Sequence, residues 1–475
     1  MAGVKAWKVG QPGAPDFPDD FEIVKKAVLQ VTDLTNNNNK YYAVELHAAG
    51  GRFRVFTHYG RTDDLETNPN AGAKECRYLD SLPEAEACYA SIYREKTSPQ
   101  KGYKEVALAS SRIGSQKARG TSSGDVDAKT LQRIAKKDED PAVKPSTLPP
   151  GVQDLVRYVY DEATSALTST VAARITANGI ETPLGILTLG QIEKGEQILA
   201  ELYDVFAVEK NPIRRQAEQT RLTGEFYTAV PHRIGRTRAA IGNAVINSLE
   251  LFNQKQETLQ LMKDMLQVNG EGGSVLFDAR ADAEYEALKC QIGCLEPGSG
   301  AFKEIAEYVV NSQVKSRAIR VRNVFTLKRD AEFNEFTSGL GNQKLLFHGS
   351  RIQNWVGILS RGILLPKIVV SLGVNRTDAG WLGNGLYFGD AACTSAFYTT
   401  PGHKGTRFLA IARVALGKMK DFTKITYGLA GPPEGFHSCH GVRNRPGKPS
   451  EFEDDEYVVY TTKQQRLEYL VEFAA

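Results

Sequence analysis

The spacing of apolar residues changes several times along this 475-residue chain, and each spacing favours a different kind of fold. Residues 41–47 and 52–59 alternate polar and apolar side chains on either side of a glycine turn, which predicts a β-hairpin. Residues 83–96 begin with proline and acids and end with bases, as helices commonly do. The pattern predicts a small mixed α/β module over residues 21–109, after a flexible N-terminal segment at 1–20.

A polar stretch follows this module. Residues 110–146 are rich in serine, glycine, lysine and aspartate and contain almost no large apolar side chain, so we expect a linker there. Its eight basic residues exceed its five acidic residues by three, which equals the formal charge of +3 for the whole chain. Weak phosphate affinity and a solvated tether both fit this composition, and the tether is the simpler interpretation.

After Pro149 the apolar residues recur at the helical period of 3.6. One stripe of the first predicted helix consists of Val152, Leu155, Val156, Val159, Tyr160, Ala163 and Leu167. Further helical stretches are expected at residues 189–206, 239–267 and 281–293. We therefore predict an all-α bundle over residues 147–295.

Beyond about Pro297 the pattern becomes β-rich, with short apolar runs between glycine-containing turns. The predicted strands are residues 318–327, 344–348, 385–388, 408–414 and 456–460. A β-rich third domain at 296–475 completes a multidomain α+β chain. Three domains agree with the two to four that the length suggests.

The composition excludes several classes of protein. The 59 basic and 56 acidic residues nearly balance, so no polyanion partner follows from charge alone. Six cysteines without a repeated paired spacing favour a reducing compartment over a disulfide framework. The mean hydropathy is -0.34, and neither an 18-residue apolar run nor a secretory signal is recognisable, so we expect a soluble intracellular protein.

Two groups of residues in the sequence have side chains that can bind a metal. Cys290 and Cys294 are four residues apart without a second pair, which favours one buried helix face over a zinc site. His437, Cys439 and His440 lie too close together to surround an ion without distant ligands. We expect no metal.

The common nucleotide and zinc signatures, GxxxxGK[ST], GxGxxG and HExxH, are absent from the sequence. Three strand-associated segments remain: LLFHGSR at 345–351, GNGLYFGDAACTSAFY at 383–398 and DDEYVVY at 454–460. Each alone also fits a structural role, such as a core histidine, packed tyrosines or a solvated strand edge.

Taken together and in this order, the three segments resemble the His-Tyr-Glu signature of the poly(ADP-ribose) polymerases. Residues 152–155 and 226–232 are similar to the helical regulatory domain of that family. Tyr59-Gly60-Arg61 resembles the Trp-Gly-Arg core of its WGR domain. The resemblance runs from residue 21 to the end and points to the DNA-dependent branch, with WGR, helical regulatory and catalytic domains.

The resemblance implies a DNA-break-stimulated enzyme of the DNA damage response that transfers ADP-ribose from NAD to itself and other proteins and elongates poly(ADP-ribose). NAD is the expected co-substrate. The implied catalytic residues are Glu456, His348 and Tyr387. Glu456 would bind the nicotinamide-ribose 2′-hydroxyl and stabilise the cation that forms as the glycosidic bond breaks.

The resemblance also assigns an NAD-binding set: His348, Gly349, Ser350, Tyr387, Ser395 and Tyr398. Tyr387 and Tyr398 would form the walls of a nicotinamide slot. Ser395 and Tyr398 are three residues apart, which predicts that they are neighbours on one helix face. The Gly349 backbone and the Ser395 hydroxyl would bind the carboxamide, and His348 would bind an adenosine-ribose hydroxyl.

Several positions depart from the family pattern. Asn384 and Thr394 stand where lysines are common, Leu364 stands where an arginine is expected, and residues 380–382 read Gly-Trp-Leu. Lost cations weaken contacts to the pyrophosphates of a growing polymer. Mono-ADP-ribosylation with the same fold is therefore the alternative to elongation.

Tyr59 and Arg61 are the predicted DNA-binding residues, the tyrosine by stacking on a terminal nucleotide and the arginine by reaching a phosphate. The acids that follow them weaken a phosphate site. The expected partners are DNA strand breaks and protein acceptors, with a monomer in the absence of DNA and no membrane. The expected location is the nucleus in a eukaryote or the cytoplasm and nucleoid in a bacterium.

Two other functions fit parts of this pattern. The first is a catalytically weak protein that holds DNA ends through the WGR module. The second is a toxin-like NAD glycohydrolase, which the long helical region disfavours.

Overall fold

The computed structural model describes most of the chain, namely residues 4–126, 145–170, 174–176, 179–232, 234–271, 281–313, 319–365 and 380–474. The chain forms two compact units. The first contains residues 1–140 and 167–266, and the second contains residues 141–166 and 267–475. The residues predicted to form one helical domain, 147–295, therefore divide between the two units.

The N-terminal part of the first unit is a six-stranded sheet with the order β1-β5-β4-β3-β2-β6. Its strands are β1 (Trp7–Lys8), β2 (Glu22–Asp33), β3 (Asn38–Ala49), β4 (Arg52–Arg61), β5 (Ala73–Leu79) and β6 (Lys104–Glu105). The predicted hairpin is confirmed, because β3 and β4 pair in antiparallel register with Ala49 opposite Arg52. The 3-10 turn η1 (Thr62–Glu66) follows β4.

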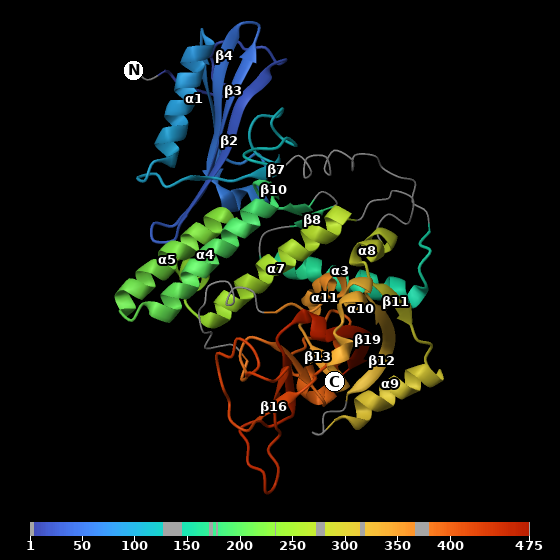
Figure 1. Ribbon diagram of the computed structural model, residues 1–475. Helices are drawn as coiled ribbons and strands as arrows, with labels where there is room; N and C mark the ends of the chain where they lie inside the picture. The colour runs from blue at the N-terminus through green and yellow to red at the C-terminus, as the bar shows by residue number, and fades with distance from the viewer. Residues whose placement is uncertain are drawn as a thin grey trace. The chain divides into compact units, whose positions relative to one another are not determined.

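Helix α1 (Leu82–Thr97) lies along this sheet (Figure 1). It begins where the Ser81 side chain accepts a hydrogen bond from the Glu84 amide, as an N-cap does. Its Ile92 packs against Leu29, Val44 and Val55 of the sheet. The predicted helix at 83–96 is therefore confirmed, and its apolar face closes the core of the module.

The first part of the predicted linker is folded, which corrects the sequence-based expectation. Strand β7 (Leu108–Ser111) pairs with β10 (Gly185–Leu187), and Ile113 is buried. The Ser115 amide donates to the buried Glu45 carboxylate at 2.7 Å. Polar contacts to a buried acid hold this segment, so its low content of large apolar residues was misleading. Residues 127–144 of that linker lie outside the described residues.

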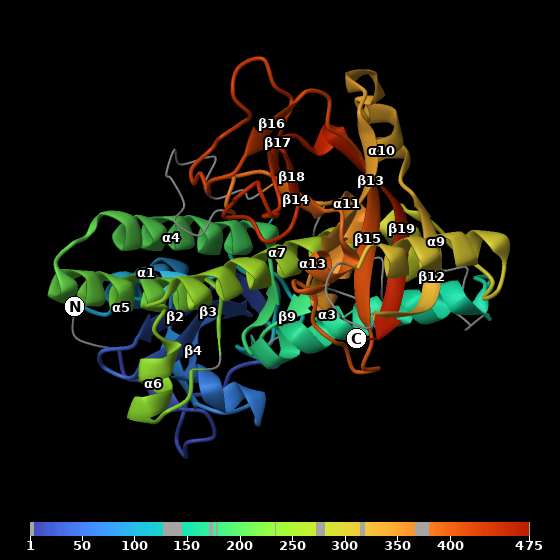
Figure 2. The same cartoon turned by 90° about the horizontal axis from the view of Figure 1, so that it is seen from below.

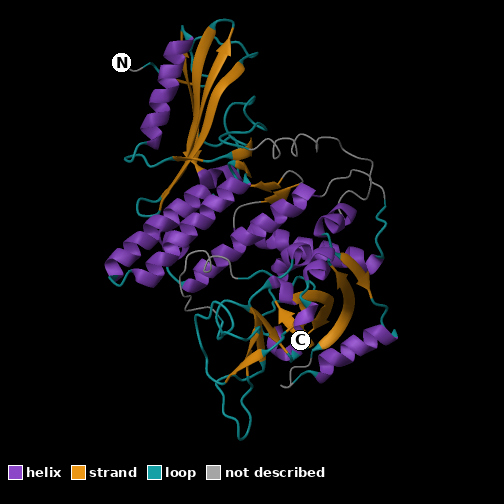
Figure 3. Cartoon of the chain, viewed as in Figure 1, coloured by secondary structure: helices purple, strands orange, loops and turns teal. Residues whose placement is uncertain are grey.

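The helices of the first unit are α4 (Leu189–Val208), α5 (Pro212–Ala229), α6 (Arg238–Ala244) and α7 (Leu249–Glu271). Figure 2 shows α4 and α5 side by side, and Figure 3 shows how helices dominate this part of the unit. The stretch predicted as one helix at 239–267 is broken between α6 and α7, where the Ile246 amide donates to the Thr223 hydroxyl at 3.1 Å. A side chain of α5 thus satisfies a backbone donor at the break.

Three short strands accompany these helices: β8 (Arg174–Thr176), β9 (Gly179–Glu181) and β10. With β7 they form a four-stranded sheet in the order β7-β10-β9-β8. Strands of three residues carry too short a pattern to separate from their helical surroundings, so periodicity alone does not reveal them.

The second unit is built around a nine-stranded sheet in the order β11-β12-β19-β15-β13-β14-β18-β17-β16. Its strands are β11 (Gln291–Cys294), β12 (Arg320–Lys328), β13 (Gln343–Gly349), β14 (Leu386–Gly389), β15 (Arg407–Ala415), β16 (Met419–Phe422), β17 (Ser438–Gly441), β18 (Glu456–Val459) and β19 (Gln465–Ala474). All five strands predicted here correspond to strands of this sheet, namely β12, β13, β14, β15 and β18, although residues 319, 385 and 460 lie just outside them. Residue 318 lies outside the described residues.

Helices and 3-10 turns flank this sheet in the same unit. They are α3 (Pro150–Thr170), α8 (Ala281–Leu288), α9 (Gly300–Asn311), α10 (Asp330–Glu335), α11 (Trp355–Arg361), α13 (Ala392–Ala396), η2 (Ser338–Leu340), η3 (Ile352–Asn354) and η4 (Thr462–Gln464). Tyr158 of α3 donates a hydrogen bond to the Thr406 carbonyl at 3.3 Å, next to β15.

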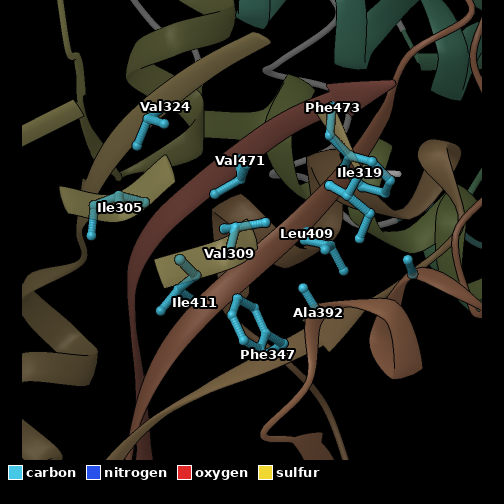
Figure 4. Close-up of a cluster of buried hydrophobic side chains, with 11 residues drawn as sticks. Ile305, Val309, Ile319, Val324, Phe347, Ala392, Leu409, Ile411, Val471 and Phe473 are labelled. Atoms are coloured by element: carbon cyan, nitrogen blue, oxygen red, sulfur yellow. The ribbon is translucent and has the colours of Figure 1, made fainter. Parts of the chain in front are cut away.

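A cluster of buried apolar side chains lies between α9 and the sheet of the second unit. Figure 4 shows Val309 of α9 among Leu409, Ile411 and Val471 of the central strands, with Phe347 beside them. All five side chains are fully buried. This core fixes β13 up to the residue before His348, which positions the site described below.

The predicted helix at 281–293 is too long. Helix α8 ends at Leu288, and Gln291–Cys294 is strand β11, paired with β12. Cys290 and Cys294 therefore do not share a helix face, and all six cysteines are free thiols. The four-residue spacing is compatible with a helix, but the backbone groups of β11 form their hydrogen bonds with β12 instead.

The described residues contain neither a group of three His, Cys, Asp or Glu side chains arranged to hold a metal ion nor a helix with the length and hydropathy of a membrane span.

Candidate active site

Three adjacent segments of the nine-stranded sheet bring the predicted catalytic residues together. His348 lies near the end of β13, Tyr387 in β14 and Glu456 at the start of β18. Strand β14 pairs with β13 on one side and with β18 on the other, where Glu456 lies opposite Gly389. The sheet therefore converts three segments far apart in sequence into one surface.

His348 is held by the backbone of the neighbouring strand. Its Nδ1 lies 3.0 Å from the carbonyl oxygen of Tyr387. A carbonyl only accepts hydrogen bonds, so Nδ1 carries the hydrogen. Burial lowers the pKa of His348, which keeps the ring neutral and leaves Nε2 as an acceptor. This histidine is suited to accept a hydrogen bond from a hydroxyl group.

The Tyr387 ring is fixed at both its hydroxyl and its edge. The hydroxyl donates to the Gly383 carbonyl at 2.8 Å and accepts from the Leu382 amide at 2.9 Å. A Cβ atom at Gly380 would lie 2.2 Å from Cζ of this ring, so only glycine fits there. Burial raises the pKa of Tyr387, and the ring forms a rigid, neutral wall.

Glu456 is the acid of this site with the most altered protonation. Burial, and next the nearby Asp454 carboxylate, raise its pKa to about 7. Its charge also contributes to raising the pKa values of Tyr387 and Tyr398, which places the three groups in one electrostatic environment. Near neutral pH this carboxyl is close to half ionised, so it can serve as an anion or as a proton carrier.

Asp454 and Asp455, which precede Glu456, have different partners. Thr394 Oγ1 donates to Asp454 at 2.8 Å. Asp455 accepts from His440 at 2.9 Å, from the Arg443 amide at 3.0 Å and from Arg445 at 2.9 Å. Arginine charges therefore compensate Asp455, while the charge of Asp454 acts on Glu456.

The Arg443 guanidinium joins three acids of this region. It lies 3.1 Å from Asp390, 3.7 Å from Asp454 and 3.8 Å from Asp455. Sequence reasoning singled out neither Arg443 nor the contact between residues 394 and 454. The two consecutive aspartates before Glu456 were the visible signal, because neighbouring buried carboxylates need cations or donors nearby.

The backbone of Gly349 lies tightly against the short helix α13. A Cβ atom at this position would lie 1.9 Å from the Ser395 carbonyl oxygen. The Ser395 hydroxyl is buried and donates to the Phe347 carbonyl at 2.9 Å. That hydrogen is therefore engaged within the protein, and donation to a carboxamide, as predicted, requires the hydroxyl to turn.

Tyr398 lies near this group but not on the expected helix face. Helix α13 ends at Ala396, and the Tyr398 amide donates to the Ser395 carbonyl in a turn. The helix-face interpretation is therefore wrong, because the helix stops before the tyrosine. The Tyr398 side chain is 64% exposed, which leaves most of its surface available to a ligand. Ser350, which also belongs to the predicted NAD-binding set, accepts a hydrogen bond from the Asn354 side chain at 3.1 Å.

The two predicted DNA-binding residues lie in β4 of the first unit and are engaged within it. Tyr59 stacks on Tyr42 with ring centroids 5.3 Å apart, and its hydroxyl donates to Glu75 at 3.0 Å. Arg61 donates to the Asn37 carbonyl at 2.9 Å and pairs with Asp63 at 3.4 Å. The side chains expected to meet DNA thus support their own module.

Comparison with protein families matches three regions of the chain. The family model described as the poly(ADP-ribose) polymerase catalytic domain matches residues 299–475. The poly(ADP-ribose) polymerase regulatory domain matches residues 146–270, and the WGR domain matches residues 25–109. The first match contains His348 and Glu456, and the three domains follow one another in the predicted order.

Individual relatives agree with these matches. The human protein named "Protein mono-ADP-ribosyltransferase PARP4" is 31% identical over 97% of this chain, which spans 24% of that protein. The mouse protein named "Protein mono-ADP-ribosyltransferase PARP3" is 27% identical over 94% of this chain, which spans 87% of it. An Arabidopsis thaliana "Poly [ADP-ribose] polymerase 1" is 25% identical over 95% of this chain, which spans 47% of it.

These findings confirm the predicted family and the predicted class of enzyme domain, that of the NAD-dependent ADP-ribosyltransferases. They also confirm the predicted combination of a WGR module, a helical region and a β-rich catalytic domain. The chain belongs to the poly(ADP-ribose) polymerase family.

Proposed function

We propose that this chain transfers ADP-ribose from NAD to protein side chains, its own among them, and releases nicotinamide. The observation that carries the proposal is the convergence of His348, Tyr387 and Glu456 on adjoining strands. In the reaction, the bond between ribose C1′ and the nicotinamide nitrogen breaks, and a bond between C1′ and an acceptor atom forms. The acceptor loses its proton to solvent or to a base.

Glu456 supplies the anion that this bond cleavage needs. Positive charge builds on the ribose as nicotinamide leaves, and glycosidases stabilise comparable states with carboxylates. Because the free site holds this carboxyl at a pKa of about 7, the positive charge of bound NAD shifts it toward the ionised form. Ionised Glu456 can then accept a hydrogen bond from the ribose 2′-hydroxyl and stabilise the cation.

His348 and Tyr387 bind and orient the substrate in this proposal. The neutral His348 ring offers Nε2 to a hydroxyl of the adenosine ribose. The Tyr387 ring, fixed by its two backbone hydrogen bonds, forms a wall for the flat nicotinamide, whose cationic form in NAD is attracted by an aromatic face. Neither residue needs to transfer a proton.

We propose further that each acceptor receives one ADP-ribose unit. Thr394 stands at a position where a lysine is common in the family. Its hydroxyl donates to Asp454, the acid that lies beside Glu456. The nearby cation Arg443 is already paired with Asp390 and close to Asp455. A growing polymer presents a pyrophosphate, which these acids repel. Relatives are named both as mono-ADP-ribosyltransferases and as poly(ADP-ribose) polymerases, so their names do not decide between the two.

Intact-mass measurement after exhaustive reaction with NAD tests both parts of this proposal. Transfer predicts mass increases of one ADP-ribose per modified site, mapped by peptide analysis, and release of an equal amount of nicotinamide. The double variant Thr394→Lys with Asp454→Asn restores a cation and removes an acid, so peptides with two or more linked units are expected. Linked units in the unchanged protein contradict single transfer, and absence of any transfer contradicts the first proposal.

We also propose that DNA ends stimulate the reaction through the WGR module. Support comes from the polar contacts of Arg61 in the first unit. Its partner Asn37 donates to the Arg236 carbonyl at 3.1 Å, and its partner Asp63 accepts from the Ile234 amide at 3.4 Å. Ile234 and Arg236 belong to the segment after α5, in the region that the regulatory-domain model matches. A phosphate drawn to Arg61 therefore competes with contacts that reach the helical region.

Transfer rates with nicked, blunt-ended and no DNA test this stimulation. Nicked or blunt DNA is expected to raise the rate, and Arg61→Ala is expected to lose that rise. Arg77→Ala is the matched control, because Arg77 pairs with Glu75 on another strand of the module. Equal rates with and without DNA contradict the proposal.

A further inference from the structure

The segment 226–232, singled out in the sequence for its likeness to the regulatory region, borders a cavity that the proposed transfer reaction does not use. The cavity has a volume of about 230 Å³ and lies within the first unit. Its lining comes from α5, α6, α7 and the connections between them, and it includes Tyr227, His232 and Lys255. None of its described lining residues is acidic.

His232 is the buried polar group of this cavity. Its side chain belongs to a residue that is only 4% exposed, and it packs against the Tyr227 ring at 4.6 Å. Nδ1 lies 2.6 Å from the Val230 carbonyl, so Nδ1 carries a hydrogen. Burial, and next the positive charge of Lys255, lower the pKa of His232. The ring is therefore neutral, and its other nitrogen, Nε2, is a hydrogen-bond acceptor.

The Nε2 atom is buried without a hydrogen-bond partner among the described residues. Leaving a buried acceptor without a donor is unfavourable, so such atoms usually face water or a ligand. Because His232 lines the cavity, a group inside it that carries a hydrogen can supply the missing bond.

Lys255 contributes a cation to the same cavity. Within the described part of the chain, its ammonium has one recorded interaction, with the Tyr227 ring 5.4 Å from the ring centroid. Burial lowers the pKa of Lys255 to about 8. Water can satisfy His232, but only an anion can also neutralise Lys255.

We propose that this cavity binds a small oxyanion that retains a hydroxyl hydrogen, of the chemical class of hydrogen phosphate. Its negative oxygens would meet the Lys255 ammonium, and its hydroxyl would donate to His232 Nε2. The volume of the cavity suits an inorganic ion or a small acid and leaves little room for a nucleotide. A bound anion would join side chains of α5 and α7 and so stabilise the helical part of the first unit.

Calorimetric titration of the full chain with inorganic phosphate at pH 7, in the absence of NAD and DNA, tests this site. Saturable binding of one phosphate is expected, together with slower amide hydrogen exchange in α5–α7. Sulfate at equal ionic strength carries no hydrogen at this pH, so at least tenfold weaker binding is expected. This measurement does not depend on the transfer reaction, so either proposal can fail alone.

Two variants separate the cavity from general salt effects. Lys255→Met is expected to weaken phosphate binding at least tenfold while it keeps the fold, because it replaces a buried cation with an apolar chain of similar length. Lys194→Met on the exposed face of α4 is the matched control and is expected to bind as the unchanged protein does. No saturable binding, or binding that Lys255→Met leaves intact, overturns the proposal, and equal sulfate binding overturns the role of His232.

Discussion

The strands that carry His348, Tyr387 and Glu456 differ from the strand that carries Tyr59 and Arg61 in what their polar atoms contact. In the second unit, His348 is held by the hydrogen bond from its Nδ1, and its Nε2 is available to a ligand. In the N-terminal module, the Tyr59 hydroxyl donates to Glu75. The Arg61 guanidinium donates to the Asn37 carbonyl and pairs with Asp63.

This difference shows that the residues of a family motif can act on a ligand or can hold their own domain together. In the reaction that we propose, the motif residues of the catalytic domain act on the substrate, and His348 keeps Nε2 for it. In the WGR module the motif residues also build the module, so a loss of DNA binding after mutation has two physical explanations. Measurements that separate folding from binding are needed there, and measurements of turnover are needed in the catalytic unit.

Apart from substitution of Glu456 itself, the largest effect is expected from Gly349→Ala. The new Cβ would lie 1.9 Å from the Ser395 carbonyl, so β13 and α13 must move apart beside the substrate site. Displacing a binding group by about 1 Å can cost on the order of 100-fold in rate. The check is kcat/KM for NAD, with Gly339→Ala as control because a Cβ there meets no atom within 4 Å. Equal loss in both variants would show that the site does not depend on this contact.

The next largest effect concerns Tyr59, where the two explanations make opposite predictions. If Tyr59 is structural, Tyr59→Ala lowers the free energy of unfolding by about 3 kcal/mol and Tyr59→Phe by about 1 kcal/mol, since the latter loses only the Glu75 hydrogen bond. Denaturant unfolding and DNA titration on the same samples distinguish the cases. Reduced DNA affinity in Tyr59→Ala with unchanged stability would instead support direct stacking on a nucleotide.

A smaller effect is expected on pH dependence. Because the proposed mechanism uses ionised Glu456, kcat/KM should fall as pH drops below about 7, the pKa of this carboxyl in the free protein. Asp454→Asn removes a negative charge that raises this pKa, so the break should move to lower pH by about one unit. Burial still acts in the variant and keeps the break above the ordinary value of 4.5.

Asp421→Asn is the control for this shift, since Asp421 is exposed and pairs with His440 instead. Its pH profile is expected to match that of the unchanged protein. A break that stays near 7 in Asp454→Asn would mean that burial alone sets the pKa of Glu456.

Much of the fold followed from the sequence where the pattern was long. The hairpin of β3 and β4, helix α1 and the main strands of the catalytic sheet all carry regular alternation or a capped helical repeat. Short or polar elements were missed. Strand β11 lies where the pattern predicts the end of a helix, and residues 112–126 belong to the predicted linker although the Glu45 carboxylate accepts a hydrogen bond from Ser115 among them.

The site was predictable residue by residue only through the family resemblance. Spacing alone could not bring residues 348, 387 and 456 together, because strand order in the sheet is set by tertiary packing. The interaction of Thr394 with Asp454 joins positions 60 residues apart and has no local signal. The end of α13 before Tyr398 escaped prediction for a similar reason, since helix boundaries depend on the turn that follows.

The most direct test of the central claim measures nicotinamide release and ADP-ribose transfer from labelled NAD in the unchanged protein and in Glu456→Gln. The variant keeps the shape of the side chain but cannot become an anion, so transfer should fall by about 1,000-fold. NAD binding should change far less, because His348 and Tyr387 remain. Transfer that survives Glu456→Gln at a similar rate would contradict the assignment of this carboxylate and, with it, the account of the site.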